Sequence, residues 1–141
     1  MNILPEKTVL AIDPGNSKCG LALVERKKQG EIKLLWHAIA PIQQLTTYAQ
    51  QALEIKPFSM LITGSGPTSN AVTLQIKEKL PSIGVLLVDE KNTTLDARAK
   101  YWEHHPRKGW RQLWPASLQI PPKPIDDYVA LILAERVLSG N

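Results

Sequence analysis

The segment Val9–Val24, VLAIDPGNSKCGLALV, constrains the fold of this chain more than any other stretch of it. Two short apolar runs flank a turn that contains Pro14, Gly15 and Gly20. Turn residues of this kind between apolar flanks predict a β-hairpin whose strands are buried. Asp13 comes at the end of the first strand, where a carboxylate needs water, a hydrogen-bond donor or a metal ion. Taken alone, this position is equally typical of a turn aspartate and of a functional acid.

Length and composition are typical of one folded domain. The 141 residues are 43% hydrophobic and 21% charged, which is ordinary for a soluble protein with its own core. The sequence has neither a signal-peptide pattern at its start nor an apolar run of about 18 residues that could span a membrane. Its single cysteine, Cys19, excludes an internal disulfide and fits a reducing compartment. We therefore expect a single domain over residues 1–141 that is cytoplasmic and does not associate with membranes.

Apolar periodicity and turn residues predict the other elements. After the hairpin we expect a strand over 32–40, a helix over 42–55, a strand over 58–63, a helix over 68–80, a strand over 85–88, and helices over 93–103 and 125–138. The strand–helix–strand unit over 58–88 predicts two parallel strands joined by a right-handed crossover. The fold class is therefore α/β, with a five-stranded mixed sheet of three antiparallel and then two parallel strands, and helices on both faces.

Acidic side chains stand at the ends of several predicted elements. Asp13 ends the first strand, Glu90 follows the last strand, and Asp126 and Asp127 open the last helix. Ligands of α/β sheets gather beyond the carboxyl ends of parallel strands, so we expect these carboxylates to meet there. Converging carboxylates repel one another unless a cation is present, and Mg²⁺ or Mn²⁺ prefers such oxygen ligands. Two such ions about 4 Å apart are a common arrangement for phosphodiester hydrolysis.

Each acid also has a purely structural interpretation. Glu90 could be a solvated acid at a strand end, and an aspartate in the first turn of a helix often serves as a cap. Neighbouring residues on a helix point about 100° apart, so at most one of Asp126 and Asp127 faces the site squarely. We expect one ligand and one cap, and both assignments remain open.

A basic and aromatic region precedes the last helix. The chain carries a net charge of +4, and much of the basic charge lies near three tryptophans. Aromatic rings stack on unpaired bases and basic groups meet phosphates, which favours nucleic acid as the partner; the alternative is a lid over the core. The candidate nucleic-acid contacts are Lys18, Lys91, Thr93, Arg98, Trp102, Arg107, Lys108, Trp110 and Arg111.

Three motifs resemble one family in matching order. They are Ala11-Ile-Asp-Pro-Gly15 leading into Cys19-Gly-Leu-Ala22, then Asp89-Glu-Lys-Asn-Thr-Thr94, and finally Ile125-Asp-Asp-Tyr-Val-Ala130. They resemble RuvC/YqgF-type members of the RNase H-like nuclease superfamily, most closely the YqgF-like proteins. The resemblance implies an RNase H-like fold and a nuclease in which Asp13, Glu90 and the Asp126/Asp127 pair hold two Mg²⁺ or Mn²⁺ ions.

The resemblance also bears on the details of the site. Asp126 matches the YqgF-like spacing to Ala130, and Asp127 matches the RuvC spacing better. Where the family commonly has arginine in its second motif, this chain has Lys91, which would weaken a bidentate phosphate contact.

The predicted function is a metal-dependent endonuclease that acts on structured RNA or branched DNA. The YqgF-like resemblance implies processing of pre-16S rRNA, whereas the RuvC-like resemblance implies resolution of Holliday junctions, for which symmetric cleavage requires a homodimer. One alternative is a nucleic-acid-binding module without catalysis. Another is a dinucleotide-binding protein, because the loop Gly64–Ser69 and the later Asp89 copy part of a Rossmann fingerprint, although the third glycine is missing.

Overall fold

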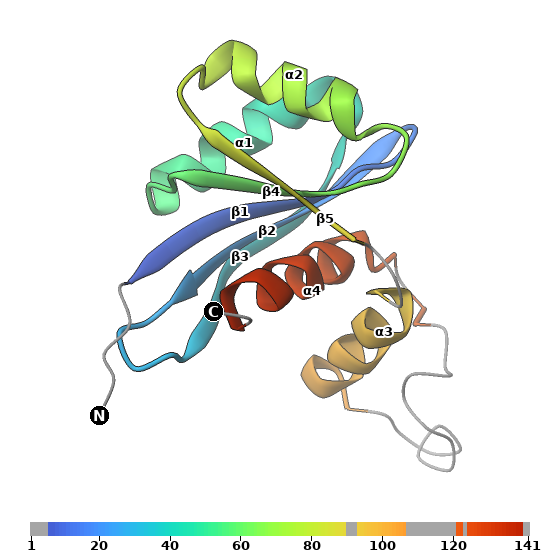
Figure 1. The fold of residues 1–141 in the computed structure, drawn as a ribbon. Coiled ribbons are helices and arrows are strands. Elements are labelled where there is room, and N and C mark those ends of the chain that lie inside the picture. Colours follow the sequence, from blue (N-terminus) through green and yellow to red (C-terminus); the bar gives the residue numbers. More distant parts are fainter. Residues whose placement is uncertain (1–5, 90–92, 107–120, 123, 140–141) are drawn as a thin grey trace.

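The structure, a computed structural model, describes residues 6–89, 93–106, 121–122 and 124–139. Its strands are β1 (Lys7–Asp13), β2 (Lys18–Arg26), β3 (Ile32–Pro41), β4 (Met60–Gly64) and β5 (Gly84–Val88). Its helices are the short 3-10 helix η1 (Ile42–Gln44), α1 (Leu45–Ile55), α2 (Ser69–Lys79), α3 (Thr93–His104) and α4 (Asp126–Ser139) (Figure 1). Among these residues, no helix combines the length and apolar character that crossing a membrane requires.

The five strands form one mixed sheet in the order β3-β2-β1-β4-β5. β1 and β3 are both antiparallel to β2, whereas β4 is parallel to β1 and to β5. This arrangement confirms the predicted fold class and places Asp13 at the end of the middle strand. Because β2 runs antiparallel to both of its neighbours, the sheet is not the doubly wound parallel sheet of a Rossmann domain.

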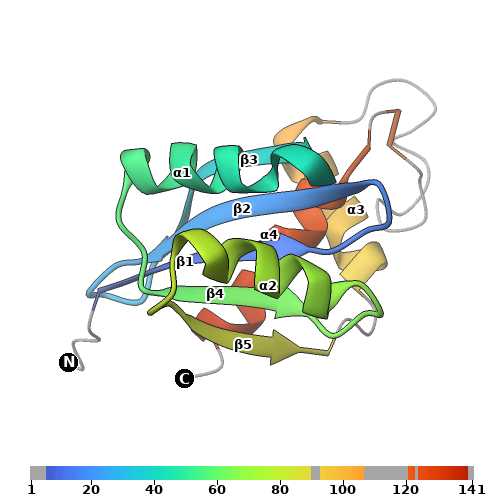
Figure 2. The same ribbon diagram turned by 90° about the horizontal axis from the view of Figure 1, so that it is seen from above.

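The sheet is covered by helices on both faces (Figures 1 and 2). Helices α1 and α2 pack on one face over Leu10, Ile12 and Leu21. Helix α4 packs on the other face over Val9, Ala11 and Ala22, and α3 lies outside α4. The middle strand is therefore buried on both sides, which explains why its sequence reads as an unbroken apolar run. Helix α4 lies between the sheet and α3, and it is buried continuously over residues 127–134.

The elements differ from the predicted ones mainly at their ends. The hairpin strands β1 and β2 extend beyond the apolar runs that predicted them. Polar residues at the strand ends continue the pairing between the two strands. The helix expected over 42–55 begins instead as the separate 3-10 turn η1, and Pro41 belongs to the end of β3. Backbone hydrogen bonding, and not side-chain periodicity, sets these boundaries.

A buried ion-pair cluster lies at the opposite end of the hairpin from Asp13. The side chain of Glu25 on β2 is only 2% exposed and pairs with both Lys27 and Lys56. The Lys27 ammonium lies 2.9 Å from the carboxylate, and the Lys56 ammonium donates a hydrogen bond to its other oxygen. The hydrogen bonds from Lys56 and Lys27 lower the pKa of the Glu25 carboxyl from its usual value of 4.5.

Glu25→Gln is expected to lower the free energy of unfolding by about 1 kcal/mol at pH 7, a modest loss because both lysines remain partly exposed and screened. The folded-state pKa lies below the unfolded one, so the stabilisation is complete above about pH 4.5 and is lost as the pH falls through the lowered value. Urea unfolding at pH 7 and at pH 3 measures the effect. The control is Glu6→Gln, since Glu6 is exposed and lies 3.9 Å from Lys28. A deficit of Glu25→Gln that is equal at both pH values would contradict this account.

Candidate active site

The site begins with the close approach of α4 to β2. Asp13 pairs across the ladder with Gly20, and a Cβ atom added to Gly20 would lie 1.9 Å from the carbonyl oxygen of Asp126 and 2.5 Å from the amide nitrogen of Asp127. Only a residue without a side chain lets the first turn of α4 lie this close to the strand. Because side chains alternate along a strand, Asp13 faces the same side as Ala11, which is the side that α4 covers.

Asp126 directs its carboxylate toward the hairpin. Its Oδ2 lies 3.9 Å from the ammonium group of Lys18, which is the first residue of β2, and its side chain is about one-third exposed. Burial raises the pKa of the Cys19 thiol, and the negative charges of Asp13 and Asp126 raise it further. Both carboxylates therefore act on the same short segment at the end of the hairpin.

Asp127 makes different contacts although it follows Asp126 directly. Its Oδ2 lies 2.6 Å from the Nδ1 of His37 on β3, and its Oδ1 accepts the Tyr128 backbone N–H at 3.0 Å. Its side chain is only 11% exposed. Both oxygens are thus engaged by protein groups, as expected for two neighbouring helical residues that point in different directions.

Glu90 and Lys91 lie outside the described residues, but the strand end that precedes them is described. Arg136 on α4 donates a hydrogen bond to the Asp89 carbonyl oxygen at 3.1 Å and pairs with Asp96 on α3 at 3.2 Å. The guanidinium therefore connects the end of β5 with the two helices on that face of the sheet.

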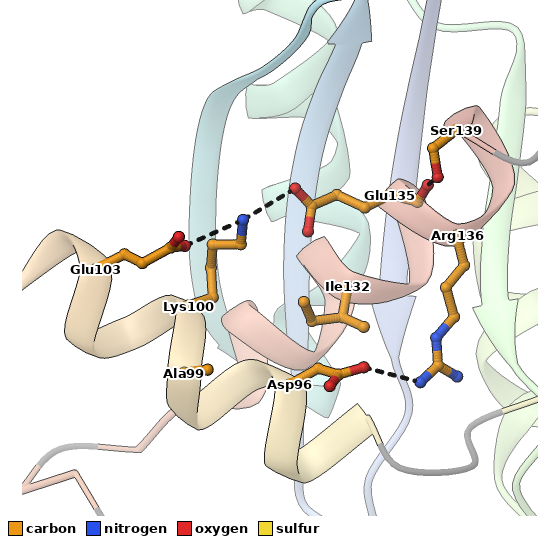
Figure 3. Close-up of a pocket in the computed structure, with 8 residues that line it drawn as sticks. All are labelled: Asp96, Ala99, Lys100, Glu103, Ile132, Glu135, Arg136 and Ser139. Atoms are coloured by element: carbon orange, nitrogen blue, oxygen red, sulfur yellow. Dashed lines mark hydrogen bonds and ion pairs between the residues drawn. The ribbon is translucent and has the colours of Figure 1, made fainter. Parts of the chain in front are cut away.

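A groove between α3 and α4 has a volume of about 530 Å³ (Figure 3). Its lining does not include Asp13, Asp126 or Asp127. Its charged groups already pair with one another, because Lys100 bridges Glu103 and Glu135 at 3.2 Å each. Such internally paired charges stabilise the packing of the two helices. They leave little unpaired charge in the groove for a ligand.

The donors of the site suit a hard divalent cation. In the described part of the chain, no group of three or more histidine, cysteine, aspartate or glutamate side chains gathers where it could hold a metal ion. That part contains three of the four predicted acids: Asp127 is engaged by His37 and the Tyr128 amide, whereas the close contact at Gly20 brings the backbone of Asp126 near the strand position opposite Asp13. Carboxylate oxygens are the ligands that Mg²⁺ and Mn²⁺ prefer, so these donors fit the predicted metal.

The predicted nucleic-acid contacts are placed unevenly. Thr93 and Trp102 are buried, and Trp102 packs edge-on against Tyr101, so neither side chain is exposed for a nucleic-acid strand. Arg98 is half-buried on α3, and Lys18 is exposed beside Asp126. The remaining contacts lie outside the described residues; they are Lys91, Arg107, Lys108, Trp110 and Arg111.

His37 is a site residue that the sequence interpretation missed. It pairs with Ala22 on β2. Asp13 pairs with Gly20, and Gly20 pairs with Ile39 on β3, so His37 is two residues along β3 from the position level with Asp13. Its only sequence signal is a polar residue that interrupts the apolar part of the strand, between Trp36 and Ala38. The sheet register is what brings it to the first turn of α4.

Comparisons with known proteins establish the fold. No family model matches the chain, and a search of curated proteins finds no match. The structure of T. thermophilus RuvC in complex with a Holliday junction substrate matches with a TM-score of 0.60 at 14% identity, covering 94% of this chain and 91% of that one. A second Thermus thermophilus RuvC structure matches with a TM-score of 0.58 at 14% identity, over 94% and 92% of the two chains. The yeast mitochondrial Holliday junction resolvase Ydc2 gives 0.54 at 10% identity, over 97% and 80%. The chain therefore has the RNase H-like fold that these resolvase structures share.

Proposed function

We propose that this protein is a divalent-metal-dependent endonuclease that acts on structured nucleic acid. The observation that supports the proposal is the close packing of the start of α4, at Asp126, on Gly20, which pairs across the ladder with Asp13 at the end of the middle strand. The fold shared with RuvC and Ydc2 supports the same function. The acidic motifs that carry the family resemblance occur at these positions. We also propose that residues 1–141 form a single cytoplasmic domain.

Asp13, Asp126 and Glu90 would hold Mg²⁺ or Mn²⁺. When bound, two such ions would supply an activated water and neutralise the negative charge that develops on the oxygens of the reacting phosphate. Lys18 lies beside Asp126 and is half exposed, so its ammonium is placed to contact a substrate phosphate. Asp127 holds the first turn of α4 against β3 through His37, which keeps Asp126 directed toward the hairpin.

Two substrates follow from this proposal. The motif resemblance favours precursor 16S rRNA, whereas the structural likeness favours branched DNA, since one matching RuvC structure contains a Holliday junction substrate. Symmetric cleavage of a junction requires two active sites, so that activity would need a homodimer. The two substrates are distinguished by assay.

Removal of divalent metal is expected to abolish cleavage. We would incubate the purified full chain with a four-way DNA junction, a linear duplex of the same sequence and a precursor 16S rRNA fragment, each with Mg²⁺, with Mn²⁺ or with EDTA. The expected result is cleavage of the junction or of the rRNA fragment in Mg²⁺ and Mn²⁺, little cleavage of the linear duplex, and none in EDTA. Cleavage that persists in EDTA would refute the mechanism. Tight binding without cleavage in any metal would favour the binding-module alternative.

A further inference from the structure

All three histidines of the chain gather around one tyrosine. His37 comes from β3, whereas His104 and His105 come from the end of α3 and the residue after it. Their ring centroids lie 5.7, 5.4 and 6.4 Å from that of Tyr128 on α4. Elements far apart in the sequence thus bring these three exposed residues to one place, which we call the histidine surface.

Each of the three imidazole rings makes its hydrogen bond through its own Nδ1 atom. The Nδ1 of His37 lies 2.6 Å from the Asp127 carboxylate, that of His104 lies 3.1 Å from the Tyr128 hydroxyl, and that of His105 lies 3.1 Å from the Tyr101 carbonyl oxygen. A carboxylate and a carbonyl only accept, so the Nδ1 atoms of His37 and His105 carry the protons. Among the described residues, each ring has this one side-chain hydrogen bond, at Nδ1, and no bond at Nε2.

The chemistry of these rings suits a nucleic-acid strand. A neutral ring of this tautomer accepts at Nε2 from a sugar hydroxyl or a base amino group, and a protonated ring donates to a phosphate. His105 also stacks on Tyr101 at 4.3 Å with 16° between the ring planes, which resembles the platforms on which unpaired bases stack. Among the described residues, no group of three or more histidine, cysteine, aspartate or glutamate side chains could hold a metal ion here.

The histidine surface is continuous with the candidate active site. Asp127, which holds His37, is the direct neighbour of Asp126. On the sheet, His37 lies two strands across and two residues along from Asp13, with strands about 4.8 Å apart and residues about 3.4 Å apart. The basic residues Arg107 and Lys108 follow His105 closely in the sequence. The histidine surface therefore lies next to the candidate active site, on the side of α3.

We infer that the histidine surface binds the nucleic-acid strand that leaves the carboxylate site toward α3. The inference rests on the proposed function, because it assigns a second contact to the same substrate. His37 is a substrate-contacting residue in this arrangement, and Asp127 positions it.

Binding without divalent metal tests the inference, because it needs no cleavage. In EDTA, we would follow the ring nitrogens of the ¹⁵N-labelled full chain by NMR as an unlabelled four-way junction or rRNA fragment is added, and would measure Kd by fluorescence anisotropy. We expect the ring signals of all three histidines to shift. We expect the double variant His104→Gln/His105→Gln, and separately His37→Gln, to raise Kd by roughly five- to tenfold.

The control variant is Lys77→Gln, an exposed basic residue on α2 at the opposite face of the sheet, which should change Kd less than about twofold. Circular dichroism would check that each variant is folded, and the exposed pair His104/His105 keeps the test valid if His37→Gln unfolds. Nucleic acid that binds with unshifted histidine signals and unchanged variant Kd values would overturn the inference, as would a wild-type chain that binds neither ligand. Histidine shifts without cleavage in Mg²⁺ would retain the histidine surface and refute the nuclease proposal.

Discussion

Asp13→Asn is expected to reduce phosphodiester cleavage by about 10³-fold or more while leaving the fold intact. Asp13 ends the middle strand, where an amide fits the same space but lacks the negative charge that holds a divalent cation. Single-turnover cleavage rates in saturating Mg²⁺ measure the loss, and thermal unfolding measures the fold. Cleavage at the wild-type rate would remove Asp13 from the site.

The same experiment separates the two adjacent aspartates of α4. Asp126→Asn is expected to lose cleavage as Asp13→Asn does, because its carboxylate is directed toward the hairpin. Asp127→Asn is expected to lose less activity and more stability, because the Asp127 carboxylate is nearly buried and holds His37 and the Tyr128 amide. The reverse pattern would make Asp127 the metal ligand.

Asp96→Asn is the control for the loss of one negative charge. Asp96→Asn removes a carboxylate that is about half exposed and pairs with Arg136 outside the proposed site. We expect this variant to cleave at close to the wild-type rate. A loss similar to that of Asp13→Asn would mean that activity depends on overall charge or on the packing of α3.

Gly20→Ala is expected to lower the free energy of unfolding by about 3 kcal/mol and to reduce cleavage as well. The added methyl group would lie 1.9 and 2.0 Å from the carbonyl oxygen and carbon of Asp126, which are backbone atoms at the start of α4. The helix must therefore shift away from β2, and Asp126 moves with it. Urea unfolding measures the stability, and cleavage by the folded fraction measures the displacement of Asp126.

Gly84→Ala is the matched control for this substitution. Gly84 begins the edge strand β5, and its added Cβ would have its nearest neighbour, the Ser59 carbonyl oxygen, at 3.9 Å. We expect this variant to change stability by less than about 0.5 kcal/mol. If Gly20→Ala were as well tolerated as Gly84→Ala, the close packing of α4 on β2 would be refuted.

The order and type of the elements could be predicted because they depend on local patterns. The apolar runs of the hairpin, the strand–helix–strand unit and the paired acids at the start of the last helix all lie within short windows of sequence. The structure places the strand that ends with Asp13 in the middle of the sheet, between its hairpin partner β2 and the parallel strand β4. The ends of the strands could not be predicted from the apolar runs, because the hydrogen bonds between strands extend beyond the apolar residues.

The buried state of Trp102 shows where local patterns mislead. Beside arginines and lysines in the sequence, this tryptophan is typical of a nucleic-acid contact. In the fold it lies on the inner side of α3 and packs against Tyr101 in the core that α4 shares. Which face of a helix is buried depends on its neighbours, and α3 packs on α4, a helix that follows it in the chain.

The sequence by itself determined the fold class, the carboxylates that were candidates for a metal site and the expectation of nucleic-acid chemistry, because each rests on residue type and local spacing. Only the tertiary structure distinguished Asp126 from Asp127. Both residues are acids in the same helical turn, and their difference comes from Lys18 on β2 and His37 on β3. The histidine surface likewise required the register of β3 and the packing of α3 on α4, which join residues up to 68 positions apart along the chain, from His37 to His105. Contacts of such long range are set by how the layers pack, and no local window of sequence contains both partners.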